Sequence, residues 1–356
     1  MRLKVDIEKR LGSFLLKSKI DIDSEMIAVL GASGSGKSMT LKCICGIEKP
    51  DKGRIILGDE VLFDSEKKIN VPTRKRKIGY LFQDYALFPN MTVKENIECA
   101  STDLDYAKNL IKKFDLEDVK NKYPSQLSGG QSQRCALARM LANKPKVLMF
   151  DEPFSALDNH LKNRVEHEIL DIISKFNGPM ILVSHDRNEV YRLARKIGIM
   201  DNGNLIDIQD RDDFFDNPRT VTSARLTGCK NISNIEYRDE KIYAKDWGIY
   251  LDIPKQVLDK KKKDLEKIKY VGYRGHYFKL KEKLGVNTFK CHKTRIIEDT
   301  FSVTVCFKQS GNKSEGLDSV LTWIISKPVW LKIKDKIDDN EFYLQLDSSK
   351  LILLER

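Results

Sequence analysis

Short, wholly apolar runs stand out in the first part of the chain. Three such runs are followed by glycine or polar residues: MIAVL at residues 26–30, VLMF at 147–150 and MILV at 180–183. Runs that are apolar at every position are typical of strands buried on both faces of a parallel sheet. MTLKCICGI at 39–47 and the stretch around 133–141 are compatible with helices. We therefore predict an α/β fold for this part.

The pattern changes beyond Arg225. Apolar and polar positions alternate there in short runs, which Gly, Asn and Asp turns separate: IYAKDWGIYLDI, VGYRGHYFKL, FSVTVCFKQ, LTWIIS, VWLKI and EFYLQL. Alternation with a period of two is typical of strands that have one buried face. We predict that all of these runs are strands of a small barrel or sandwich.

Length and composition narrow the classes of protein to which this chain can belong. With 356 residues the chain is longer than one compact core usually is, so we expect two domains. No apolar run approaches the roughly 20 residues of a membrane-spanning helix, and the start MRLKVDIEKR lacks the apolar stretch of a signal peptide, so we expect a cytosolic protein.

The seven cysteines are scattered without a CxxC pair, which argues against disulfides and zinc; we interpret them as small buried hydrophobes. The net charge of +11 fits nucleic acid, an anionic membrane or simply a basic protein.

A glycine-rich loop follows the first apolar run. GASGSGKS at 31–38 fits the pattern G-x-x-x-x-G-K-[ST] between a strand and a helix. Glycines let backbone N–H groups turn toward phosphate oxygens, and the start of the helix adds a positive dipole end. Lys37 is expected to reach the outer phosphates, and Ser38 to bind Mg²⁺. The candidate nucleotide-binding residues here are Gly31, Ala32, Ser33, Gly34, Ser35, Gly36, Lys37, Ser38 and Met39.

Two carboxylates follow the second apolar run. Asp151 and Glu152 stand at the carboxyl end of a predicted parallel strand, where ligands of such sheets collect. We expect Asp151 to hold Mg²⁺ and Glu152 to orient and deprotonate the attacking water. His185 follows the third run and is placed to hydrogen-bond the γ-phosphate or that water.

A second helix start of the anion-binding type occurs in LSGGQ at 127–131. Ser128 is a good N-cap, and Gly129 and Gly130 expose backbone N–H groups beside Gln131. One nucleotide does not need two such helix starts. The surplus suggests a site that two copies of the chain share.

LSGGQ together with the glycine-rich loop resembles the nucleotide-binding subunit of ABC transporters. The resemblance covers Met1 to about Lys230, with the motifs in the family's order. It implies a P-loop ABC ATPase domain at 1–230, with a helical subdomain at about 84–140. It also implies that the chain hydrolyses ATP with Mg²⁺ at the cytoplasmic face of the cell membrane, as a peripheral subunit.

The resemblance assigns further residues. Gln83 matches the glutamine that links the metal site to the membrane subunits, Asp158 in SALD matches the D-loop, and His185 the switch histidine. It implies a head-to-tail dimer in which each ATP lies between the Lys37 loop of one copy and Ser128–Gln131 of the other. The implied partners are a second copy, membrane permease subunits and, indirectly, a solute-binding protein.

Two regions leave alternatives open. The family usually places an aromatic residue against adenine near the chain start, where this sequence has Leu11, with Phe14 three residues later. After Gln83, the residues Tyr85, Leu87, Phe88 and Pro89 either receive the coupling helix of the membrane partner or belong to the core of the helical subdomain.

The tail at 231–356 resembles the oligomer-binding-like (TOBE) β domain appended to importer ATPases for molybdate, sulfate, sugars and polyamines. Residues 52–89, including LFDSEKKINVP, look most like molybdate-importer ATPases. This resemblance favours molybdate or tungstate as the solute and suggests an oxyanion bound at the tail. Sulfate is the near alternative, and a sugar, a polyamine or iron are further ones.

Other classes fit less well. A soluble ABC ATPase acting on ribosomes or nucleic acid would usually carry two cassettes or a long coiled coil, and a P-loop kinase has no use for LSGGQ. Lys260–Lys263 form a basic run, but four lysines in a linker are more often simply solvated. No nucleic-acid partner is expected.

Overall fold

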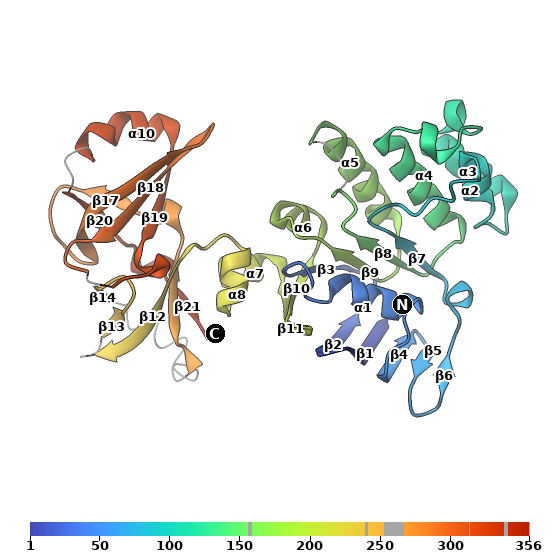
Figure 1. Cartoon of the computed structure of the whole chain (residues 1–356), viewed down its shortest axis with the longest axis horizontal. Helices are drawn as coiled ribbons and strands as arrows, with labels where there is room; N and C mark the ends of the chain where they lie inside the picture. Colours follow the sequence, from blue (N-terminus) through green and yellow to red (C-terminus); the bar gives the residue numbers. More distant parts are fainter. Residues whose placement is uncertain (156–158, 239–240, 253–266, 313, 338–340, 356) are drawn as a thin grey trace. The chain divides into compact units, whose positions relative to one another are not determined.

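The computed structural model describes residues 1–155, 159–238, 241–252, 267–312, 314–337 and 341–355. They form two compact units, Met1–Arg211 and Asp212–Arg356, which are described separately below (Figure 1). Asp158 and the basic run Lys260–Lys263 lie outside the described residues.

One eleven-stranded sheet runs through unit 1, in the order β6-β5-β4-β1-β2-β11-β10-β3-β9-β8-β7. The strands are β1 (Leu3–Leu11), β2 (Phe14–Ile22), β3 (Met26–Leu30), β4 (Lys52–Leu57), β5 (Glu60–Asp64), β6 (Ile69–Asn70), β7 (Ile78–Leu81), β8 (Val147–Asp151), β9 (Met180–Val183), β10 (Lys196–Asp201) and β11 (Asn204–Asp210). Neighbours from β10 through β3, β9 and β8 to β7 are parallel, whereas β1 pairs antiparallel with β2 and β4.

The three predicted apolar runs are confirmed as central strands. Every residue of β3, β8 and β9 is buried. Their carboxyl ends therefore meet at one edge of the sheet, and that edge carries the glycine-rich loop, Asp151 and His185.

Some helices of unit 1 cover this sheet, and others form a helical subdomain (Figure 1). They are α1 (Lys37–Cys45), α2 (Val93–Glu98), α3 (Leu104–Lys113), α4 (Gly129–Ala142), α5 (Asn159–Lys175) and α6 (Arg187–Leu193). The predicted helical region at about 84–140 contains α2, α3 and α4, which pack on one another.

Arg76 holds the carboxyl end of the helix that follows the glycine-rich loop. Its side chain is buried and donates from Nη1 to the carbonyls of Cys43 and Ile44, at 3.1 and 2.7 Å. A cation at the carboxyl end of a helix satisfies the last carbonyls and the negative dipole end. Helix α1 is thus fixed at the end that lies away from the loop.

Two five-stranded antiparallel sheets form unit 2, in the orders β14-β13-β12-β15-β21 and β16-β20-β17-β18-β19. The strands are β12 (Asn231–Arg238), β13 (Lys241–Ala244), β14 (Ile249–Leu251), β15 (Tyr270–Tyr273), β16 (Lys279–Lys281), β17 (Thr288–Glu298), β18 (Ser302–Gln309), β19 (Leu321–Ser326), β20 (Glu341–Gln345) and β21 (Ile352–Leu354). Both sheets contribute to one core, which includes Trp247, Tyr273, Phe307 and Trp323. The β-rich second domain is confirmed.

The units divide at 211/212 rather than at the predicted 230/231. Two short helices, α7 (Arg211–Asp216) and α8 (Val221–Leu226), lie between the two boundaries. Ala224 of α8 packs in a small core with Ile232 and Leu354. The segment before β12 therefore belongs with the β unit.

One predicted strand is wrong. VWLKI lies in a helix, α10 (Lys327–Ile333), with Pro328 in its first turn. Proline has a preset φ that suits this position. Trp330 is buried and Ile333, three positions on, is half-buried, whereas Lys332 is exposed. A strand that buries Trp330 would bury residue 332 as well, so this spacing of three fits a helix.

Candidate functional site

The glycine-rich loop connects β3 to α1 and has little space for side chains. A Cβ on Gly31 would lie 2.3 Å from the carbonyl oxygen of Met200, and one on Gly36 would lie 2.7 Å from Cδ1 of Leu16. Gly36 also has φ 108°, in the left-handed region that favours glycine. Both glycines are therefore required by the geometry.

Lys37 is buried at the first position of α1. Its Nζ donates to the carbonyls of Gly31 and Ala32, both at 2.9 Å. Burial lowers the pKa of Lys37, and the carboxylates of Asp151 and Glu152 oppose that shift. The ammonium is thus held inside the loop, close to two negative side chains.

Asp151 ends strand β8 and is bound on both oxygens. Ser38 Oγ donates to Oδ1 at 2.8 Å, and the hydroxyl of Tyr80 donates to Oδ2 at 2.7 Å. Burial and the hydrogen bond to Asp151 raise the pKa of Tyr80, so it stays a donor. Tyr80 comes from the neighbouring strand β7, where it pairs with Met149.

Glu152 lies in a strained turn directly after the strand. Its φ of 46° is left-handed, and its N–H donates to the carbonyl of Val183 at 2.9 Å. Its Oε2 lies 3.3 Å from Nδ1 of His185. The two side chains that the sequence places after separate strands are therefore in contact.

A pocket of about 410 Å³ joins these parts. Its lining is Leu11, Phe14, Ser33, Gly34, Gly36, Lys37, Ser38, Met39, Gln83 and Glu152. Gln83 and Glu152, far from the loop in the sequence, thus lie around one cavity with it. Leu11 and Phe14 are both on its wall, and ring atoms of Phe14 would lie 3.3 Å from a Cβ on Gly36.

The second predicted anion-binding element is a well-formed helix start. Ser128 and Gln131 form a capping box at α4: Gln131 N–H donates to Ser128 Oγ, and Ser128 N–H to Gln131 Oε1. Among the described residues that line the pocket, none comes from Ser128–Gln131.

The residues present fit a nucleotide with a divalent cation. The exposed N–H groups of the loop and the start of α1 suit phosphate oxygens. Ser38 and Asp151 offer neighbouring hard oxygen atoms, which Mg²⁺ prefers. Among the described residues, no group of three or more His, Cys, Asp or Glu side chains could hold a metal ion.

Sequence reasoning did not identify Tyr80. The signal is a tyrosine inside the short strand IGYL, because a hydroxyl that is partly buried in a sheet usually has a hydrogen-bond partner. The interpretation of the cysteines is confirmed for five that are buried, namely Cys43, Cys45, Cys135, Cys229 and Cys291. It is wrong for the exposed Cys99, and Cys306 is only half-buried. Burial raises the pKa of Cys43 to about 11.

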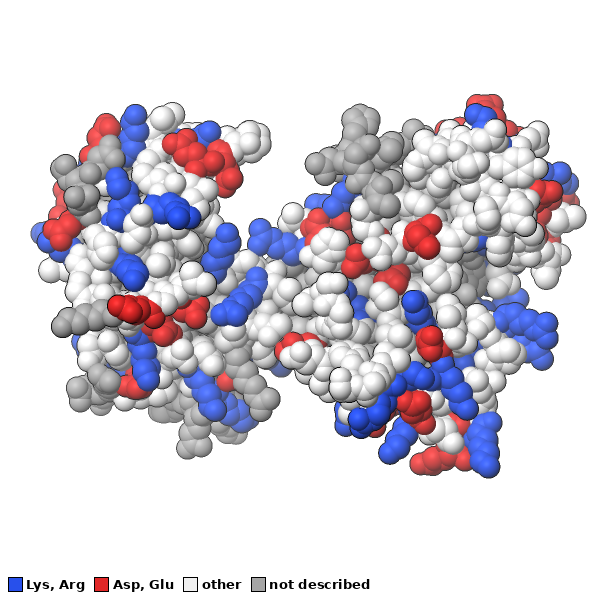
Figure 2. All heavy atoms as spheres, viewed as in Figure 1, with Lys and Arg blue, Asp and Glu red and all other residues white. Residues whose placement is uncertain are grey.

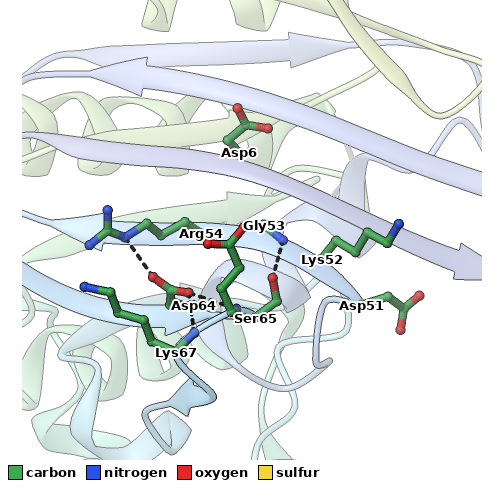
Figure 3. A pocket seen from close by; sticks show the side chains of 9 residues that line it. Asp6, Asp51, Lys52, Gly53, Arg54, Asp64, Ser65 and Lys67 are labelled. Carbon is green, nitrogen blue, oxygen red and sulfur yellow. Dashed lines mark hydrogen bonds and ion pairs between the residues drawn. The ribbon is translucent and has the colours of Figure 1, made fainter.

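A second pocket, of about 690 Å³, lies over β4 and β5 (Figure 3). Asp64 in its lining accepts from the backbone N–H groups of Glu66 and Lys67, and pairs with Arg54 at 3.2 Å. The hydrogen bond from Lys67 N–H lowers the pKa of Asp64 most. These contacts stabilise the turn after β5.

Within the described residues, no helix is long and apolar enough to cross a membrane.

Comparisons with known proteins show which proteins this chain is similar to. The sequence profile of the ABC transporter domain matches residues 20–155. The chain is 37% identical over 236 residues to the probable sulfate/thiosulfate import ATP-binding protein CysA of Chlorella vulgaris, which covers 63% of this chain and 98% of that protein. It is 38% identical over 206 residues to the molybdenum import ATP-binding protein ModC of Aliivibrio fischeri, covering 57% of each.

Another relative and a solved structure extend the comparison. The putrescine transport ATP-binding protein PotG of Escherichia coli is 36% identical over 242 residues, covering 65% of this chain and 60% of PotG. A dimeric ATP-binding cassette in a post-hydrolysis state, bound to ADP and Pi, superposes with a TM-score of 0.50 at 26% identity, covering 59% of this chain and 99% of the other.

Proposed function

We propose that this chain, which belongs to the ABC transporter family of ATP-binding proteins, is the ATP-hydrolysing subunit of an importer for molybdate or a related oxyanion. The observation that carries the ATPase role is the pocket where Gln83 and Glu152 meet the Lys37 loop. The proposal that the transporter is an importer rests on the names of the relatives, which are import ATP-binding proteins. The proposed solute rests on the sequence of residues 52–89.

Each side chain has a role that its position supports. Lys37 and the loop N–H groups bind the outer phosphates of ATP, while Ser38, Asp151 and Gln83 would hold Mg²⁺. The ion, when bound, neutralises charge on the phosphate oxygens. Glu152 orients and deprotonates the attacking water, and His185 supports it through the 3.3 Å contact.

We infer that the working unit is a head-to-tail dimer. Ser128–Gln131 form an anion-binding helix start that does not line the chain's own pocket. In the dimer this helix start completes the nucleotide site of the other copy. The solved structure of a similar cassette is dimeric, which supports a dimer.

The segment after Gln83 is the proposed contact with a membrane permease. Tyr85 is buried and belongs to the core, whereas Phe88 is 46% exposed. In the view of Figure 2, the region of helices α2–α4 is mostly free of charged side chains. Exposed aromatic side chains are enriched at protein contacts, which supports Phe88 as part of this one.

The solute is proposed to be molybdate or tungstate. Its support is the likeness of residues 52–89 to molybdate-importer ATPases and the similarity to ModC. Similarity to CysA and PotG keeps sulfate and polyamines as alternatives. The C-terminal unit is the proposed place where an oxyanion binds.

The test is uptake of molybdenum, tungsten and sulfate by cells that lack this chain, against the same cells restored with the wild type or with Glu152→Gln. Loss of molybdenum or tungsten uptake, restored only by the wild type, would support the proposal. Unchanged uptake of all three would withdraw the solute and leave the ATPase role to be tested directly.

A further inference from the structure

Helix α4 carries an amide side chain in the core. Gln133 is fully buried, and its Nε2 donates to the carbonyl of Pro153 at 2.7 Å. Its Oε1 accepts from the hydroxyl of Tyr85 at 3.4 Å. A buried amide is costly unless both ends are bonded, so these two partners explain a glutamine at this position.

The first partner belongs to the turn of Glu152. Pro153 follows Glu152 directly, and the left-handed φ of Glu152 persists only where surrounding bonds hold it. One such bond is that of Glu152 N–H to Val183 in β9. Ser155 donates to the carbonyl of Glu152 from its N–H and its hydroxyl, at 3.2 and 3.0 Å. Gln133 adds the bond to the carbonyl of Pro153, so α4 also holds this turn.

The second partner belongs to the segment after Gln83. Tyr85 and Ala86 also have left-handed φ values, 61° and 43°. Arg139, further along α4, donates to both of their carbonyls at 2.8 Å, and its guanidinium lies 5.1 Å from the centre of the Phe88 ring. Helix α4 therefore binds both strained segments that flank the pocket.

We propose that Gln133 is a positioning residue. It keeps Glu152 and the segment after Gln83 in fixed places relative to α4, the helix that begins with Ser128–Gln131. The inference rests on the proposed ATPase function. A change at Gln133 then affects the position of Glu152 and leaves the phosphate-binding loop intact.

The test is steady-state ATP hydrolysis by the full chain with Gln133→Met, which keeps the volume and removes both hydrogen bonds. We expect kcat to fall about tenfold while KM for ATP stays within about twofold, because a misplaced base affects the chemical step and not ATP binding. Leu137→Ala, a buried substitution on the same helix, is the control for general loosening.

Gln133→Glu tests the same hydrogen bonds without loss of a polar group. Its carboxylate cannot donate to Pro153, but the protonated form can, and burial raises a carboxyl pKa toward the assay range. We expect its kcat relative to wild type to rise as the pH falls from about 8 to about 6.

Three results would contradict these expectations in distinguishable ways. A kcat of Gln133→Met within twofold of an active wild type, or no lower than that of Leu137→Ala at equal thermal stability, would overturn the positioning role. A flat pH ratio for Gln133→Glu would do the same should Gln133→Met fail to fold. An inactive wild type would overturn the proposed function as well.

Discussion

Ser38 and Asp151 lie 113 positions apart in the sequence, and their side chains are joined by a hydrogen bond of 2.8 Å. One comes from the helix after the glycine-rich loop and the other from the end of a buried strand. The bond connects the start of the helix after the glycine-rich loop with the acidic pair Asp151 and Glu152.

Glu152→Gln is expected to bind ATP and to lose at least about 100-fold in turnover, because an amide cannot accept a proton from water. With hydrolysis stopped, ATP should hold two copies together. Size-exclusion chromatography with saturating ATP measures this, with the exposed Glu60→Gln as control. A variant that stays monomeric would contradict the shared-site dimer.

Tyr80→Phe removes the donor to Asp151 Oδ2 and keeps the ring. We expect the Mg²⁺ concentration for half-maximal ATP hydrolysis to rise about tenfold, since groups that orient a metal ligand usually have effects of this size. ATP turnover measured against Mg²⁺ tests this. Tyr106→Phe, outside the pocket lining, is the control. An unchanged Mg²⁺ requirement would show that Ser38 alone orients Asp151.

Lys37→Ala and Ser128→Ala should each be nearly inactive alone, because each removes one part of every shared site. Mixed dimers of the two variants keep one site that has both Lys37 and Ser128. ATP hydrolysis after mixing should therefore exceed that of either variant alone. Activity that stays at the sum of the separate variants would argue against sites formed by two copies.

Asp186 should make folding sensitive to acid. Burial raises its pKa, but hydrogen bonds from Lys162 and the N–H of Asn188 outweigh this and leave the pKa below its ordinary 3.8. The stability that these bonds contribute is complete above that value and is lost as the pH falls through the lower folded-state pKa. Urea unfolding at neutral and acidic pH should show a smaller loss for Asp186→Asn than for wild type. The exposed Asp59→Asn should behave like wild type.

Asn231→Ala should destabilise the C-terminal unit by about 3 kcal/mol, because it leaves buried backbone groups unpaired. The Asn231 side chain bonds Tyr273 in one sheet and Thr322 in the other, with four contacts of 2.7–3.0 Å. Chemical denaturation monitored by tryptophan fluorescence measures the change, with the exposed Asn234→Ala as control. A loss below about 1 kcal/mol would mean that the core alone joins the sheets.

The sequence was sufficient where the physical cause is local. Apolar runs identified β3, β8 and β9, because strands buried on both faces need apolar residues at every position. The glycine spacing identified the loop, because left-handed backbone favours glycine. The N-cap at Ser128 is likewise visible in the sequence. The run VWLKI was misread because its apolar residues fit both periods, and tertiary packing of Trp330 selected the helix.

Only the tertiary structure decided which distant residues meet. The contact of Glu152 with His185, the bond of Tyr80 to Asp151 and the link from Gln133 to Pro153 depend on strand order and helix packing. The segments that these contacts join are far apart in the sequence and lie side by side in the parallel sheet and against α4. A single sequence shows which side chains need partners, whereas the packing of the sheet and of α4 determines which partners they have.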